Sequence, residues 1–526
     1  DILDKTYYLK IKLENMGFII YNKTFFDTIT IDTNYNTDFI KSIFDLNNII
    51  LRYEYDKIMI SIDETTEYTD IDNILDIFKN IINYKKDFLL KKENYNMPQD
   101  IKRESKFLEQ YIFNNYHTET ELLRYINSLE KKDYTLCNGI IPLGSCTMKL
   151  NSVYQLEPLS WDKITNFHPF SPDNYVKGYL KLIDETGNYL KEITGFNHIS
   201  FQSNSGSMGE YSGLITIKKY FENKGENNRN ICIIPNTAHG TNFASARMAN
   251  FEIISYNDKN MSINDFEKFI EKYKDNLACM MVTYPNTNGV FQESIKTITD
   301  IIHDNGGMVY MDGANMNALV GITNPYEAGA DVCHLNLHKT FCIPHGGGGP
   351  GMGPILCNNK LGNFLPGNIL QDNDYSGWAI SSSNWSSASL LTIPYLYINA
   401  MGCKGLKEAT ESAILNANYL KKSLEEYYNI VDVNENGFVG HEFIIDTSEF
   451  KSLGIYDVDI AKRLIDYNFH PPTMAWPRSN VLMFEPTESE SKKELDRLIY
   501  SLINIKNEII EIKEGLYDKD NNILKN

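Results

Sequence analysis

A mostly apolar, strand-like run at residues 332–337 leads into a histidine, a lysine and a threonine in the segment 332–340, VCHLNLHKT. Three other short apolar runs, at residues 231–235, 279–284 and 308–312, also lead into polar residues. Helical stretches separate the runs, and buried strands that alternate with helices predict a mostly parallel sheet with helices on both faces. Ligands of such sheets bind at the carboxyl ends of the strands, so we expect the polar residues there to form one site.

The rest of the chain predicts smaller units around this large α/β domain, which we place at residues 136–410. Residues 1–90 predict a small α+β domain, residues 91–135 a polar connector, and residues 411–526 a second small α+β domain. Further strand signals lie at residues 25–31, within 49–62, at 440–446 and at 481–485, and helical spacing lies at 70–84, 119–129, 211–221, 407–427 and 489–512.

The composition is that of a globular protein, with 42% hydrophobic and 23% charged residues in a chain of 526. The net charge of −19 argues against electrostatic binding to nucleic acid or to an anionic membrane. Eight cysteines without framework spacing favour a reduced, intracellular setting. The chain lacks an apolar run of about 18 residues and begins with neither a targeting segment nor a methionine, so we expect a piece of a longer protein or a trimmed product.

Lys339 is the candidate nucleophile of the site. A lysine at the end of a buried strand can form a Schiff base with an aldehyde cofactor if its amine is partly desolvated. The alternative is a lysine that extends from the strand end into solvent. The neighbouring His338 and the glycine run that follows favour the functional interpretation.

Asp312 ends the apolar run at residues 308–312. A carboxylate in such a place is costly unless it has a cationic partner, and a protonated pyridine nitrogen is one. The carboxylate would keep that nitrogen charged and the ring electron-withdrawing. The alternative is an aspartate that caps a following helix.

Two further segments complete the expected site. Residues 203–210, SNSGSMGE, place small hydroxyl and glycine residues before a helical stretch, which predicts a phosphate site at the helix N-terminus or an ordinary helix cap. His239 follows the strand at residues 231–235 and could stack on a flat ring, although a lone histidine is more often structural.

A metal site and a dinucleotide site are two other interpretations of residues in this segment. Cys333, His334, His338, Cys342 and His345 crowd together like metal ligands, but consecutive strand residues point to opposite faces and the spacing fits no standard zinc site. The run at residues 346–351 satisfies G-x-G-x-x-G without the helix and acidic residue of a dinucleotide site, so we expect a close backbone approach instead. We therefore predict no metal site.

Several strings resemble the glycine decarboxylase P-protein family over most of residues 100–515. The most specific are residues 331–354, 310–321 and 141–151, IPLGSCTMKLN. Shorter matches lie at residues 168–170, 210–211, 238–242 and 485–491. Residues 1–90 resemble the end of the family's N-terminal half, with IDETT at 62–66 as the best string, so the chain is similar to the second half of a fused P-protein.

This resemblance implies a pyridoxal 5'-phosphate (PLP) enzyme of fold type I, like aspartate aminotransferase, in the glycine cleavage system. It implies that the enzyme decarboxylates glycine through an imine with PLP and passes the aminomethyl group to the lipoyl arm of H-protein. An N-terminal half, or a homo- or heterodimer, is the other expected partner. The implied location is the cytoplasm of a bacterium or the mitochondrial matrix of a eukaryote.

By the same resemblance, Lys339 would hold the cofactor, Asp312 its ring nitrogen and His239 its ring face. The expected catalytic residues are Lys339, His239 and His338. The remaining expected cofactor contacts are Ser205, Gly206, Ser207, Thr283, Ala314 and His338.

The sequence departs from the family's pattern in three places. Asn288 stands where the family usually has histidine, Ser205 and Ser207 stand where it has alanines, and residues 384–387, NWSS, replace an expected proline and glycine pattern. Other readings left open are a different fold-type I reaction, such as aldol cleavage or decarboxylation of a larger amino acid, and a cofactor-free structural subunit.

Overall fold

The computed structural model describes residues 1–33, 36–82, 100–143, 152–167, 171–258, 261–344, 351–369 and 376–525. These residues form two compact units, Asp1–Leu123 and Arg124–Asn526. Every helix in the described part of the chain is too short or too polar to cross a lipid bilayer. The finer division at residues 90, 135 and 410 remains a prediction.

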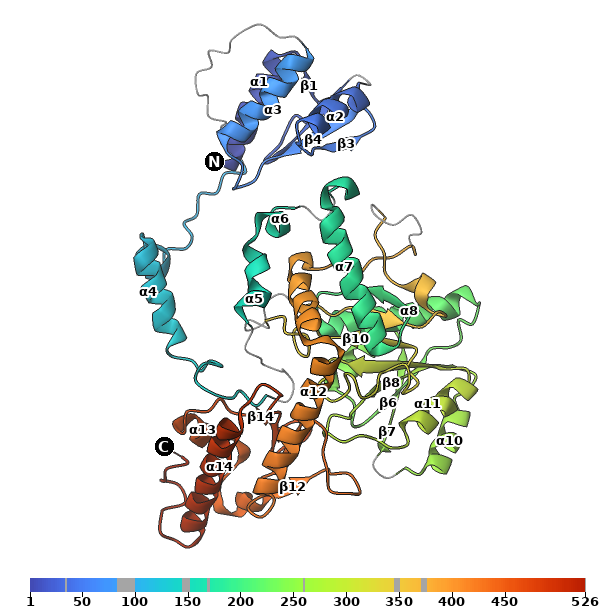
Figure 1. Cartoon of the computed structure of the whole chain (residues 1–526), viewed down its shortest axis with the longest axis vertical. Helices are drawn as coiled ribbons and strands as arrows, with labels where there is room; N and C mark the ends of the chain where they lie inside the picture. The colour runs from blue at the N-terminus through green and yellow to red at the C-terminus, as the bar shows by residue number, and fades with distance from the viewer. Residues whose placement is uncertain are drawn as a thin grey trace. The chain divides into compact units, whose positions relative to one another are not determined.

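The first unit is a four-stranded antiparallel sheet packed against helices (Figure 1). Alternate residues of its central strands are buried, with Ile29 and Ile31 on one strand and Ile58 and Ile60 on its neighbour, as period-two spacing requires. The strands and the helix expected within residues 25–84 are confirmed. The elements are α1 (Ile2–Asn15), β1 (Ile19–Ile20), β2 (Thr28–Asp32), α2 (Thr37–Leu46), β3 (Arg52–Glu54), β4 (Lys57–Ser61) and α3 (Tyr68–Ile81).

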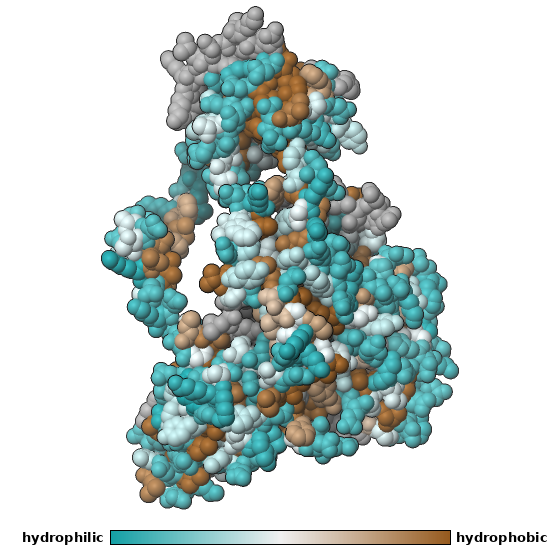
Figure 2. Space-filling view, in the orientation of Figure 1, coloured by the Kyte–Doolittle hydropathy of each residue, from teal (hydrophilic) through white to brown (hydrophobic). Residues whose placement is uncertain are grey.

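Helix α4 (Glu119–Glu130) confirms the helix expected in the connector, and it spans the boundary between the two units. Its apolar residues are exposed: Leu122, Leu123, Ile126 and Leu129 have exposed fractions between 45% and 64%. Figure 2 shows these apolar residues as a brown patch on the helix. The helix is therefore amphipathic, and its apolar face is open to solvent in this chain.

The second unit contains a seven-stranded sheet in the order β5-β11-β10-β9-β8-β6-β7. Strands β7, β6, β8, β9 and β10 are parallel neighbours, and only β11 runs antiparallel, to both β10 and β5. The expected mostly parallel α/β sheet is confirmed. Its strands are β5 (His198–Ser200), β6 (Ile231–Pro235), β7 (Glu252–Tyr256), β8 (Leu277–Thr283), β9 (Met308–Gly313), β10 (Val332–Leu335) and β11 (Ile355–Cys357).

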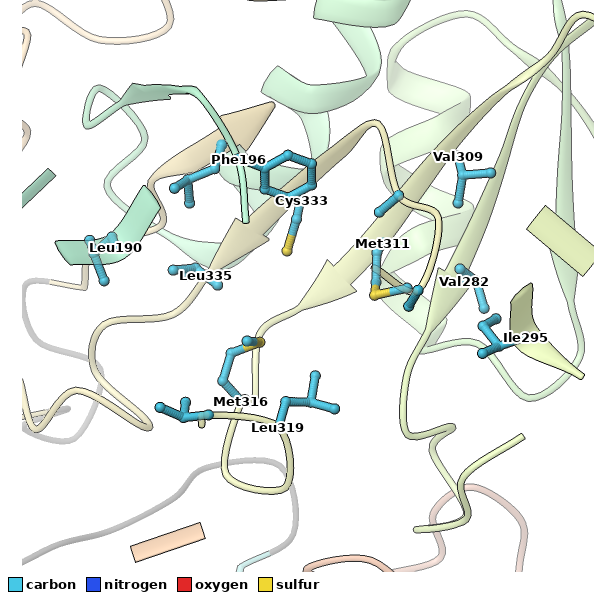
Figure 3. Packing of buried hydrophobic residues seen from close by; sticks show 14 of the residues in the cluster. Leu190, Phe196, Val282, Ile295, Val309, Met311, Met316, Leu319, Cys333 and Leu335 are labelled. Carbon is cyan, nitrogen blue, oxygen red and sulfur yellow. The ribbon is translucent and has the colours of Figure 1, made fainter. Parts of the chain in front are cut away.

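Helices cover both faces of this sheet, so its strands are apolar on both sides. On β9, Val309 and Met311 face a core shared with Leu190 (Figure 3), while Tyr310 faces a second core shared with Leu214 and Ile217. The helices of this region are α5 (Val153–Leu156), α6 (Asp162–Thr165), α7 (Asp173–Thr194), α8 (Gly206–Asn223), α9 (Gly240–Met248), α10 (Ile263–Glu271) and α11 (Ile295–Asp304).

The C-terminal region is a four-stranded antiparallel sheet, ordered β12-β13-β15-β14, with a separate apolar core. Strands β13 and β15 and the last helix agree with those expected from the sequence, whereas β12 and β14 were not expected. The elements are α12 (Thr392–Leu424), β12 (Asn429–Val431), β13 (Phe443–Asp446), α13 (Asp457–Asp466), β14 (Thr473–Met474), β15 (Val481–Phe484) and α14 (Lys492–Lys513). Short 3-10 helices lie at Tyr111–Phe113, Glu157–Ser160, Gly362–Phe364, Ala388–Leu391 and Ser448–Leu453.

Helix α12 begins at Thr392, about four turns before the expected start at residue 407. Pro394 and Gly402 disfavour a helix there by local preference, and the helix kinks at Gly402, whose φ is 60°. Burial of Ile393 and Tyr397 in the core of the large sheet overrides that preference.

Candidate active site

A cavity of about 400 Å³ lies where strands β8, β9 and β10 end and where helices α8 and α9 begin. This is the edge of the sheet at which the sequence predicted the site. All nine predicted site residues line this cavity: Ser205, Gly206, Ser207, His239, Thr283, Asp312, Ala314, His338 and Lys339. The structure thus brings together residues that lie up to 134 positions apart in the chain, from Ser205 to Lys339.

Lys339 lies in the turn that follows β10, where its backbone N–H donates to the carbonyl oxygen of Asn336 at 3.0 Å. Its side chain is half-buried and lines the cavity. Among the described residues, no carboxylate forms an ion pair with it. Its positive charge instead lowers the pKa of nearby His239 and His334, in addition to the larger effect of their burial.

Asp312 lies near the end of β9, in register with Thr283 of β8 and His334 of β10. Its carboxylate is 4% exposed, accepts from the side-chain amide of Asn242 at 3.0 Å, and accepts from the backbone N–H of Ala314 at 3.0 Å. The next element along the described chain is β10, so the helix-cap alternative for Asp312 is wrong.

His334 and Cys333 point to opposite faces of β10, as expected for consecutive strand residues. His334 is fully buried, hydrogen-bonds to the hydroxyl of Tyr310 through Nδ1, and has Nε2 3.7 Å from Asp312. Burial lowers its pKa, so the ring is neutral at pH 7. Cys333 packs in the apolar core on the other face. A metal site that uses both side chains is therefore excluded by geometry.

The N-terminus of α8 approaches the loop that leads into β11. Ser205 is the N-cap, and its Oγ accepts from the backbone N–H of Met208 at 3.2 Å, so the helix-cap alternative is confirmed as its local role. A Cβ at Gly353 would lie 2.1 Å from the carbonyl oxygen of Ser205, which means that only glycine permits this approach. Backbone N–H groups at such a terminus, together with the helix dipole, can bind an anion in the cavity.

His239 caps α9 and also lines the cavity. Its Nδ1 accepts from the backbone N–H of Thr241 at 3.3 Å, so part of its role is structural, as the alternative interpretation held. Its ring lies 5.0 Å from the ring of Trp476 at a tilt of 54°. Burial lowers the pKa of His239, which favours the neutral form of its ring.

Sequence reasoning missed several cavity residues. Glu210 lies in α8 just beyond its first turn. Thr241 Oγ1 and Ser245 Oγ donate to it at 2.6 and 2.7 Å, and burial raises its pKa to about 7. His441, Glu442 and Trp476 come from the C-terminal region. A polar pair directly before an apolar strand, His441-Glu442, is the signal that could have singled two of them out.

Three buried side chains next to this cavity could also hold a cation. Ligand atoms of His441, Glu442 and Glu485 all lie within 4.8 Å of one another. The sequence did not point to this group, because Glu485 is more than 40 residues from the other two.

The structure describes the contacts and backbone conformation of residues that depart from the family's pattern. Asn288 is buried, and its backbone N–H donates to Asn286 Oδ1 at 3.1 Å. Asn384 Oδ1 accepts from Gln202 Nε2 at 2.8 Å, and Ser386 has a φ of 51°. The signature residues 144–151, 168–170 and 345–350 lie outside the described residues.

Comparison with known proteins gives family matches over most of the chain. Residues 88–377 match the model of the glycine cleavage system P-protein, and residues 409–526 match that of the glycine dehydrogenase C-terminal domain. The chain is 47% identical to a mitochondrial glycine dehydrogenase (decarboxylating) of Dictyostelium discoideum, over 98% of this chain and 53% of that protein. It is 48% identical to the glycine dehydrogenase (decarboxylating) of Christiangramia forsetii, over 98% and 55%. The chain spans about half the length of the curated relatives it matches.

Solved structures show the same fold at low sequence identity. A glycine decarboxylase (P-protein) of the glycine cleavage system in inhibitor-bound form has a TM-score of 0.63 at 16% identity, over 85% of this chain and all of that chain. A cysteine desulfurase from Thermococcus onnurineus has a TM-score of 0.56 at 14% identity, over 72% and 97%. The fold is fold type I, as expected. Because the P-protein model matches more than half of the sequence, the chain belongs to the P-protein family of the glycine cleavage system.

Proposed function

We propose that this chain carries the PLP site of a glycine decarboxylase. It releases carbon dioxide from glycine and transfers the aminomethyl group to the lipoyl arm of H-protein. Membership of the P-protein family supports this proposal. The observation that carries it is one cavity that contains Lys339, Asp312 and the N-terminus of α8.

The residues of the cavity fit PLP. Thr283 Oγ1, His334 Nε2 and Asn336 Oδ1 are buried and find no hydrogen-bond partner among the described residues. Buried polar atoms are rarely left unsatisfied, so a polar ligand is expected to contact them. Asp312 is a buried carboxylate whose hydrogen-bond donors are neutral amides, and a protonated ring nitrogen would supply the missing positive charge.

Each part of the cofactor has a candidate partner. Lys339 would hold the aldehyde carbon, Asp312 would face the ring nitrogen and His239 the ring face. Backbone N–H groups at residues 205–207 would hold the phosphate. Thr283, Ala314 and His338 also line the cavity and complete the proposed set.

The chain's own groups prepare the site for decarboxylation. When bound, PLP takes up the electron pair that remains when a bond to the substrate's α-carbon breaks. Asp312 stabilises positive charge on the ring nitrogen. The amine of Lys339 and the imidazoles of His239 and His338 are placed to hold or move protons in the cavity. Trp476 and Met483 line part of the cavity and add apolar surface to its wall.

The proposed partners follow from the family and from the length of the chain. The lipoyl arm of H-protein would accept the aminomethyl group, since the family belongs to the glycine cleavage system. An N-terminal half is a proposed second partner, because the curated relatives are about twice as long as this chain.

The direct test is exchange of the glycine carboxyl group with labelled bicarbonate in the presence of lipoylated H-protein. The experiment has two arms, the full chain alone and the full chain co-expressed with an N-terminal half. We expect exchange by the wild-type chain and none by Lys339→Ala. Aldol cleavage of larger amino acids without exchange in either arm would overturn the proposal in favour of another fold-type I reaction.

A further inference from the structure

The cavity contains little positive charge with which to bind an amino acid's carboxylate. Lys339 is the only lysine among the described residues that line it, and none of them is an arginine. Since Lys339 is proposed to hold the cofactor, the substrate's carboxylate must find other donors. The C-terminal region supplies two candidates, His441 and Glu442, which directly precede β13 and line the same cavity.

His441 is a buried ring that makes no hydrogen bond to the described part of the chain. It is 3% exposed, and neither ring nitrogen has a hydrogen-bond partner among the described residues. Its Nε2 lies 3.9 Å from Glu485 Oε1, beyond hydrogen-bonding distance. Burial lowers the pKa of His441. The ring is therefore neutral and offers one N–H donor that the protein itself does not use.

Glu442 lies beside His441 in the same cavity, and it also has a buried polar atom for which the described residues provide no hydrogen-bond partner. It is 6% exposed, and its Oε2 has no hydrogen-bond partner among the described residues. Burial raises its pKa well above the ordinary value, the charge of Glu485 adds to this effect, and the charge of Lys339 opposes it. A protonated Glu442 offers an O–H donor.

Backbone contacts hold these two residues against the large sheet. The N–H of Gly440 donates to the carbonyl oxygen of Gly289 at 2.7 Å. Gly289 has a φ of 77°, and a Cβ there would lie 2.4 Å from the carbonyl oxygen of Glu442. The turn that follows β8 therefore fixes where His441 and Glu442 enter the cavity.

A divalent cation fits the group formed by His441, Glu442 and Glu485 less well than a carboxylate does. Both oxygens of Glu485 already accept from the side chain of Asn315, at 3.0 and 3.1 Å, and Oε1 also accepts from Asn317 at 2.8 Å. The positive charge of Lys339 acts on His441 and Glu442 and would repel a dication. A substrate carboxylate needs N–H and O–H donors rather than ligand oxygens, and His441 and Glu442 offer one donor each.

We propose that His441 and Glu442 bind the carboxylate of the amino acid substrate through two neutral hydrogen-bond donors. This inference rests on the proposed function. A guanidinium group would bind the carboxylate more strongly, but it would stabilise the bound substrate more than the transition state in which the carboxylate loses its charge. Neutral donors avoid this cost. The C–C bond breaks, the electron pair stays with the α-carbon, carbon dioxide leaves, and both donors keep their protons.

The test compares two amines on the full chain loaded with PLP, together with its N-terminal half if binding requires it. Glycine and methylamine differ by the carboxylate, and the dissociation constant of each is obtained from the change in cofactor absorbance. We expect His441→Ala and Glu442→Ala to weaken glycine binding by about tenfold or more, as for loss of a hydrogen bond to a charged group. Methylamine binding should change by less than about threefold.

Glu442→Gln is the conservative variant, because an amide keeps a donor and cannot titrate. At neutral pH it should retain glycine affinity to within about threefold. In the wild type, the affinity for glycine relative to methylamine should fall as the pH rises and Glu442 loses its proton, because a charged Glu442 repels the carboxylate. The fall should be smaller in Glu442→Gln. His198→Gln is the matched control, since its ring bonds to Asn359 outside the cavity.

The outcomes separate this inference from the proposed function. An unchanged ratio of the two affinities in His441→Ala and Glu442→Ala, with normal glycine binding by the wild type, overturns the carboxylate site alone. Glycine binding that is lost on addition of a chelator overturns it in favour of a cation site. A wild type that binds neither amine overturns both proposals. If His441→Ala does not fold, His441→Gln takes its place with the same expected selectivity for glycine.

Discussion

Glu210 is a buried carboxyl group close to Asp312, and burial raises its pKa from 4.5 to about 7. Between these values the folded protein binds more protons than the unfolded chain does. The free energy of unfolding therefore falls as the pH rises from 4.5 to 7 and levels off above 7. Glu210→Gln should reduce this fall by on the order of 2–3 kcal/mol, measured by urea unfolding at several pH values.

Glu490 provides the comparison for this experiment, because burial raises its pKa to about 7 as well and it is not among the residues that line the cavity. Glu490→Gln should reduce the same pH dependence while leaving cofactor affinity unchanged. A pH dependence in Glu210→Gln that equals that of the wild type would show that Glu210 is ionised in the folded protein.

The proposed chemistry depends strongly on the carboxylate of Asp312. Asp312→Ala should lower the rate of glycine decarboxylation by about a hundredfold or more, because charge on the ring nitrogen is no longer stabilised. Glycine should still bind, which absorbance titration would detect. A decarboxylation rate near that of the wild type would remove Asp312 from the mechanism.

At the scale of elements, the approach between the N-terminus of α8 and the loop before β11 depends on Gly353. A Cβ at this position would lie 2.1 Å from the carbonyl oxygen of Ser205, so Gly353→Ala must displace one of the two segments. We expect at least about tenfold weaker PLP binding, measured by absorbance titration. Gly178→Ala is the control, since a Cβ there meets no atom within 4 Å and should stabilise α7 by about 0.5–1 kcal/mol.

For helix α4 we expect substitutions of apolar residues to have little effect on stability, because its apolar face is exposed and packs in no core of the described chain. Leu123 and Ile126 are 64% and 52% exposed. Replacing both with serine should change the free energy of unfolding by less than about 1 kcal/mol, as for exposed positions. A larger loss in urea unfolding would mean that this face is covered in the folded protein.

The sequence predicted the elements best where a periodic pattern and burial agree. The strands β6, β8, β9 and β10 end in polar residues that gather at one edge, and this follows from their parallel order. The predicted start of α12 was wrong. Pro394 and Gly402 disfavour a helix by local preference, but packing against the large sheet stabilises one. A prediction from local pattern cannot include that packing energy.

At the scale of the whole molecule, the sequence identified the parts of the cavity that follow strands of the large sheet. It missed Trp476, His441 and Glu442, because no local signal indicates that a segment more than 100 residues beyond Lys339 folds over the same cavity. For Ser205 and His239, a structural role and a place in the cavity do not exclude each other, since each residue caps a helix and also lines the cavity.

The covalent link between Lys339 and PLP is the claim on which the account depends most. Borohydride reduction of the PLP-loaded chain, followed by peptide mass mapping, locates that link directly. The account predicts one modified residue, Lys339, and no modified peptide from Lys339→Ala. Modification of a different lysine, or of none, in the wild-type chain would contradict it.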